Sequence, residues 1–132
     1  MKKNRQIFYL LIIMLLSVIP YANAEMGGYA HIEGIEQIGL SDAEQLLKDK
    51  KAIFIDTNYQ SIRDSLGYID GAIFRDSKDY INQLPKDKNT TLVFYCLNRL
   101  CYEAGESAAQ AIKDGYKNSL VMIEGIEGWI TS

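Results

Sequence analysis

Short apolar runs alternate with amphipathic segments from residue 35 onward. The apolar runs have the length of strands and predict five of them, at residues 35–40, 52–56, 71–74, 91–95 and 119–123. Segments with helix signals fall between them, at about residues 41–50, 61–65, 78–84 and 102–115. Because strands alternate with helices, the pattern favours a parallel α/β sheet with right-handed crossovers.

The first predicted helix opens with a capping signal. Ser41 is followed three residues later by Glu44, the spacing of a capping box. Ser41 would then be the N-cap of this helix and Glu44 its third residue. This placement turns Ala43, Leu46 and Leu47 toward the core.

The clearest pattern joins a strand to a helix through a short loop. The apolar run at residues 91–95 leads directly to Cys96, and a helical pattern begins near Tyr102. Small and apolar residues share the inner face of this helix: Ala104, Ala108, Ala111 and Ile112. Backbone N–H groups of such a loop can converge on one point, where the helix dipole adds positive charge. A cysteine at that point has a lowered pKa, and its thiolate is a nucleophile. Cys96 is therefore the predicted chemical centre.

The second cysteine, Cys101, lies at the start of the same helix. In an oxidising compartment the two cysteines can form a disulfide. Closing so short a loop stabilises a protein by roughly 2 kcal/mol at most, and it consumes the nucleophile. We therefore expect a disulfide between Cys96 and Cys101 that acts as a switch, with Cys96 as the reactive thiol once it is open.

The first 24 residues have the pattern of a secretory signal peptide. A basic start is followed by an apolar run over residues 7–22 and by the small residues Ala22 and Ala24. Cleavage after Ala24 would leave a periplasmic or otherwise exported protein without a membrane segment. An uncleaved N-terminal membrane anchor is the alternative, and intact-mass analysis from the native host distinguishes the two.

The remaining chain is expected to hold a leader at residues 25–34 and one domain at residues 35–132. Loss of Lys2, Lys3 and Arg5 with the signal changes the net charge from −3 to −6. An acidic domain without a basic patch argues against nucleic-acid binding.

Several motifs then occur in a fixed order. They are Asp56 at a strand end and the segments 67–73, 92–96, 115–121 and 124–129. Together they resemble a single-domain rhodanese, a sulfurtransferase, over residues 35–129. The resemblance implies a five-stranded parallel sheet flanked by helices, with Cys96 as the residue that forms a persulfide.

The same resemblance implies the other roles. The substrate-binding loop would consist of Leu97, Asn98, Arg99, Leu100, Cys101 and Tyr102. Cys96 would take sulfur from a small sulfane donor and pass it to a thiol acceptor, on a small molecule or a partner protein. Asp56 is expected to support the site by accepting hydrogen bonds, and Trp129 by forming core or pocket wall. No cofactor and no metal is expected.

The chain also departs from the family pattern. Tyr68 and Asp70 replace a histidine and a proline, and Asn58 replaces an arginine. In the loop, Arg99 and Cys101 stand where many members have glycine and arginine. The loop keeps its length but its cation moves by two residues, which leaves open whether thiosulfate, the family's usual donor, is used. Arg99 is the candidate to steer an anionic donor.

Other protein classes require residues in different places. A tyrosine-phosphatase-like loop would need an arginine where Tyr102 stands, and a Cys-His hydrolase would need His31, which precedes the domain. Thiol-disulfide exchange between Cys96 and Cys101 is the main alternative function. A rhodanese-like binding module without turnover is a third.

Overall fold

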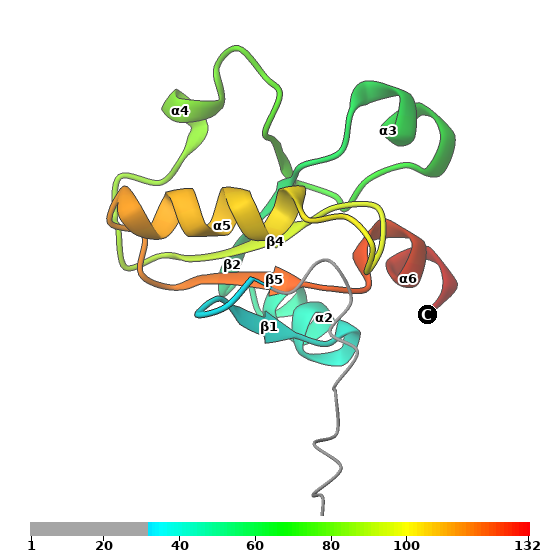
Figure 1. Ribbon diagram of the computed structural model, residues 1–132, viewed down its shortest axis with the longest axis horizontal. Helices are drawn as coiled ribbons and strands as arrows, with labels where there is room; N and C mark the ends of the chain where they lie inside the picture. The colour runs from blue at the N-terminus through cyan, green and yellow to red at the C-terminus, as the bar shows by residue number, and fades with distance from the viewer. Residues whose placement is uncertain (1–31) are drawn as a thin grey trace, which may run out of the picture.

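The computed structural model describes residues 32–132, which contain one five-stranded parallel sheet (Figure 1). The strands are β1 (Glu36–Ile38), β2 (Ala52–Asp56), β3 (Ile73–Phe74), β4 (Thr91–Tyr95) and β5 (Ser119–Met122). Their order across the sheet is β1-β5-β4-β2-β3, and each neighbouring pair is parallel. The predicted fold class and its five strands are confirmed. The predicted signal peptide and residues 25–31 of the leader lie outside the described residues.

Helices cover both faces of this sheet. They are α2 (Leu40–Lys48), α3 (Gln60–Leu66), α4 (Tyr80–Gln83), α5 (Glu103–Lys113) and α6 (Gly125–Thr131). Residues from α4 and α5 pack with Leu92 and Phe94 of the central strand β4 in one buried cluster. Residues from α2, α3 and α6 pack with Val93 and Tyr95 in the other cluster. The alternation of β4 side chains thus divides the core into two layers.

Helix α5 lies close against the sheet because its inner face is made of small residues. Ala104, Ala108 and Ala111 are buried, as the sequence predicted. Figure 1 shows the helix lying over β4 and β5. Gly115, two residues after the helix, has a φ of +99°, a backbone conformation that favours glycine and ends the helix.

The predicted capping box at Ser41 is wrong. Helix α2 begins at Leu40, its N-cap is Gly39, and the N-cap makes no side-chain hydrogen bond. Starting the helix before Ser41 packs Leu40 against the same buried cluster as Ala43, which is completely buried. Burial of apolar surface outweighs a side-chain cap that contributes about 1 kcal/mol.

Helix α6 was not predicted from the sequence. Its seven residues include Gly125 and Gly128, and glycine lowers helix propensity by about 1 kcal/mol per residue. The helix forms because Ile126 is completely buried against the core and because its first turn contacts the loop after β4. Tertiary packing, rather than propensity, decides this segment.

Within residues 32–132, no helix is long and apolar enough to cross a membrane.

Candidate active site

Asp56 and Cys96 lie side by side at the carboxyl edge of the sheet. Asp56 is the last residue of β2 and pairs with Tyr95, the last residue of β4, so Cys96 follows directly. Both strands are central in the sheet, and their carboxyl ends are where parallel α/β folds place their sites. The sequence correctly predicted this juxtaposition.

The carboxylate of Asp56 links the ends of three segments. One oxygen accepts a hydrogen bond from the N–H of Asn58 (2.7 Å), and the other accepts one from the hydroxyl of Tyr95 (2.9 Å). That hydroxyl in turn accepts a bond from the N–H of Ile69 (3.1 Å). Burial raises the pKa of Asp56 above its ordinary value, although these two hydrogen bonds act in the opposite direction. Asp56 therefore holds the loops that contain Asn58 and Ile69 in place beside the site.

The raised pKa of Asp56 gives a pH-dependent stability. The folded protein binds a proton at this carboxyl more tightly than the unfolded chain, so stability from this group is gained as the pH falls through the folded-state pKa. We expect the free energy of unfolding of the wild type, relative to Asp56→Asn, to increase from neutral toward mildly acidic pH. Urea denaturation of both proteins over a pH series measures this difference, and a decrease toward acid would contradict the assignment.

Cys96 and Cys101 are joined by a disulfide, with their Cα atoms 6.1 Å apart. Cys96 is only 5% exposed and belongs to the core cluster on the α5 side, whereas Cys101 is half-buried. The structure therefore shows the oxidised form of the site, in which Cys96 is not a free nucleophile. Any chemistry of the Cys96 thiolate requires that this bond first be opened.

Asn98 determines the shape of the loop between the cysteines. Its side-chain oxygen accepts a hydrogen bond from the N–H of Leu100 (3.0 Å), and its carbonyl accepts one from the N–H of Cys101 (3.1 Å). The first bond is the Asx turn that asparagine favours in loops. These two N–H groups therefore bond within the loop in the oxidised form. The sequence had suggested that N–H groups of the loop converge on Cys96, and these two do not.

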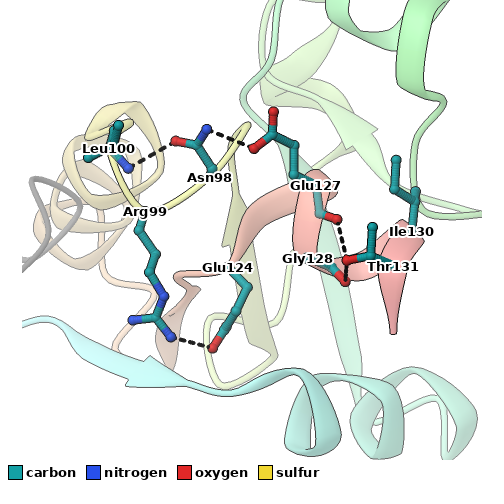
Figure 2. A pocket seen from close by; sticks show the side chains of 8 residues that line it. All are labelled: Asn98, Arg99, Leu100, Glu124, Glu127, Gly128, Ile130 and Thr131. Carbon is teal, nitrogen blue, oxygen red and sulfur yellow. Dashed lines mark hydrogen bonds and ion pairs between the residues drawn. The ribbon is translucent and has the colours of Figure 1, made fainter.

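The loop rests on the first turn of α6. The N–H of Ile126 donates to the carbonyl of Cys96 (2.8 Å), and the N–H of Glu127 donates to that of Leu97 (3.0 Å). The side-chain amide of Asn98 also donates to the carboxylate of Glu127 (2.9 Å; Figure 2). The helix that the sequence did not predict thus holds the backbone of the candidate nucleophile.

Gly125 makes this close approach possible. Its φ is +65°, and a Cβ placed there would lie 2.4 Å from the carbonyl oxygen of Leu97 and 2.6 Å from that of Cys96. Only a residue without a side chain fits between α6 and the loop.

An open cavity of about 630 Å³ lies between the loop and α6 (Figure 2). Its lining residues are Asn98, Arg99, Leu100, Glu124, Glu127, Gly128, Ile130 and Thr131. Arg99, the predicted loop cation, is exposed and forms an ion pair with Glu124 (2.8 Å). Trp129 does not line this cavity, because its ring packs on Phe54 in the core.

The remaining loop residues differ in position. Leu97 is half-buried and contacts both core clusters, whereas Leu100 and Tyr102 are 65% and 53% exposed. Tyr102 precedes α5 as its N-cap residue. The predicted substrate-binding residues thus form one continuous loop, but only Asn98, Arg99 and Leu100 line its cavity.

A buried arginine lies beside the site and was not predicted from the sequence. Arg63 of α3 donates to the carbonyl of Asn58 and to both carboxylate oxygens of Asp76 (2.8 Å each), and its guanidinium stacks over Phe74. The family arginine is absent at position 58, yet Arg63 brings a guanidinium to the backbone of that residue. No local pattern distinguished this arginine from other charges in the segment, because its burial depends on the fold.

The fold and the cysteine loop define the class of protein. The chain matches the model of the rhodanese-like domain over residues 40–132, and it belongs to this family.

Solved structures with the same fold have low sequence identity. The human single-domain sulfurtransferase TSTD1 is 18% identical, with a TM-score of 0.61 over 75% of this chain and 98% of that one. A protein of unknown function from Rhodopseudomonas palustris, described as a possible tyrosine phosphatase, is 20% identical, with a TM-score of 0.59 over 74% and 80%. BH2092 from Bacillus halodurans is 17% identical, with a TM-score of 0.59 over 97% and 81%. No curated protein matches the chain. These likenesses establish the fold.

Proposed function

We propose that the protein is a sulfurtransferase that carries sulfane sulfur as a persulfide on Cys96. The observation that supports this most directly is the position of Cys96, after the central strand and in a loop that leads into α5. Membership in the rhodanese-like family and the described activity of TSTD1 agree with it.

The proposed reaction has two nucleophilic steps. The Cys96 thiolate attacks the sulfane sulfur of a donor, a sulfur–sulfur bond forms, and the remainder of the donor leaves as an anion. The thiolate of an acceptor then attacks the outer sulfur, and Cys96 leaves as a thiolate. Because the attacking groups are thiolates and the leaving groups depart as anions, neither step needs a general base. The disulfide with Cys101 is the resting oxidised form, which a reductant must open before the first step.

Reduction should therefore switch the protein on. We expect reduced protein to pass through a form with one added sulfur on Cys96 during its first turnover with a sulfane donor, whereas oxidised protein adds none. Rapid alkylation followed by peptide mass spectrometry measures this over a panel of donors.

The switch also has an expected stability signature. Opening the disulfide should lower the free energy of unfolding by no more than about 2 kcal/mol, because the closed loop is short. A larger loss on reduction, with no sulfur taken up from any donor, would show that the disulfide has a structural role.

The charges of the loop limit the sulfur donors that can bind. Arg99 is the loop cation that lines the cavity, but it is paired with Glu124, so an anionic donor must compete with that carboxylate.

Among the alternative functions, a phosphatase is disfavoured because Tyr102 stands where its loop needs an arginine. Thiol-disulfide exchange is the second candidate, and the bonded cysteine pair favours it.

The proposed setting is outside the cytoplasm, where an oxidised cysteine pair can persist. The signal-like pattern of residues 1–24 supports this setting. The proposed partners, which follow from the two-step reaction, are a small sulfur donor and a thiol acceptor.

A further inference from the structure

The bonded cysteines suggest a fate for the persulfide other than transfer to an outside acceptor. They are the only cysteines of the chain, and their Cα atoms stand 6.1 Å apart, within the usual range for a disulfide. The sulfur of Cys101 therefore reaches the Sγ of Cys96 in the loop conformation that Asn98 and α6 hold.

Burial favours the internal thiol over an external one. Cys96 is 5% exposed in the oxidised form, so a thiol from solution has little access to its Sγ, the atom that must be attacked to release sulfide. The chain already holds the sulfur of Cys101 next to the Sγ of Cys96. Holding two reacting groups together in this way raises their effective concentration far above that of a dissolved thiol.

We propose that Cys101 resolves the Cys96 persulfide and releases its outer sulfur as sulfide, an inference that rests on the proposed function. The Cys101 thiolate attacks the Sγ of Cys96, and a disulfide forms between the two residues. The bond between the two persulfide sulfurs breaks, and the outer sulfur leaves with the electron pair as hydrosulfide. The sulfane sulfur is reduced by two electrons, one from each cysteine, and the protein is left in the form that the structure shows.

An external dithiol closes the cycle. Its thiolate attacks the more accessible sulfur, that of Cys101, and Cys96 departs as the thiolate. The second thiol of the dithiol then resolves the mixed disulfide, which restores both cysteines and oxidises the dithiol. The net activity is the conversion of sulfane sulfur into sulfide at the expense of a dithiol.

A single-turnover experiment tests this proposal. The protein is reduced, freed of reductant and mixed with thiosulfate, with benzenethiosulfonate or with inorganic polysulfide. Reductant must be absent because a dithiol would itself release sulfide from a persulfide. With the two defined donors, released sulfide is compared with the released sulfite or sulfinate, and the protein mass is recorded at completion. Wild type should release one sulfide per donor consumed and lose two hydrogens, whereas Cys101→Ser should release no sulfide and retain one extra sulfur. Circular dichroism verifies that the variant is folded.

The other outcomes separate the two proposals. If wild type and Cys101→Ser both retain the extra sulfur and release no sulfide, the resolving role is overturned and the sulfurtransferase stands. Loss of two hydrogens without sulfide would show simple oxidation and would also overturn it. If Cys101→Ser gains no sulfur from any of the three donors, the proposed function itself falls.

Discussion

Replacing Cys96 by serine is expected to reduce persulfide formation below detection, whereas Cys101→Ser is expected to accumulate the persulfide. Cys96 directly follows the central strand, and its carbonyl accepts a hydrogen bond from α6, so its sulfur has a fixed position at the carboxyl edge of the sheet. A serine hydroxyl there is not ionised at neutral pH and does not accept sulfane sulfur. Peptide mass spectrometry after alkylation measures the added sulfur in both variants.

The two variants are matched in size and chemistry, and both remove the disulfide. Any general effect of losing the cross-link is therefore common to them, and the difference reports on the nucleophile. Sulfur found on Cys101 in the Cys96→Ser protein would reverse the assignment. Equal loss in both variants would mean that the cysteines act only as a pair.

Gly125→Ala should be the most damaging small substitution beside the site. The new Cβ would meet the carbonyl of Leu97 at 2.4 Å, and that backbone is held between β4 and α6. The left-handed backbone costs roughly 1–2 kcal/mol for a residue with a side chain, and forcing the packed backbone apart adds a comparable amount. We expect the free energy of unfolding to fall by about 3 kcal/mol and the melting temperature by roughly 12–24 °C.

Gly71→Ala is the matched control. Gly71 also has a positive φ, +80°, but a Cβ there would have no atom within 4 Å. This variant carries the backbone cost alone, and we expect a loss of about 1 kcal/mol with the site intact. Thermal unfolding and persulfide trapping on both variants measure the difference. Similar losses would show that the loop can move aside, and α6 would then have no role in holding Cys96.

Persulfide formation should also fall in Gly125→Ala. Displacement of the loop removes the hydrogen bonds that the N–H groups of Ile126 and Glu127 make to it. Misplacement of a nucleophile by an ångström reduces its rate strongly, because reaction requires close alignment with the donor. The loss of sulfur loading would then exceed the loss of folded protein, and comparison at a temperature where both variants are folded reveals it.

The fold class and the position of the candidate nucleophile could both be predicted from the amino-acid sequence. Five short apolar runs alternate with helical patterns, and that periodicity reports directly on which side chains face a sheet. The end of the run at 91–95 placed Cys96 at the strand end, and parallel pairing brought it beside Asp56. Both inferences depend on local pattern and on general rules of α/β topology, so they needed no knowledge of distant contacts.

The contacts that hold the cysteine loop could not be predicted in this way, because they depend on the packing of distant elements. Three features depend on contacts between separate segments of the folded chain. They are helix α6, the close approach of the loop to Gly125 and the burial of Arg63. The start of α2 at Leu40 likewise follows from burial rather than from its capping signal. These features have no local signature because they arise from steric fit and desolvation between elements, which the chain acquires only when the sheet has formed.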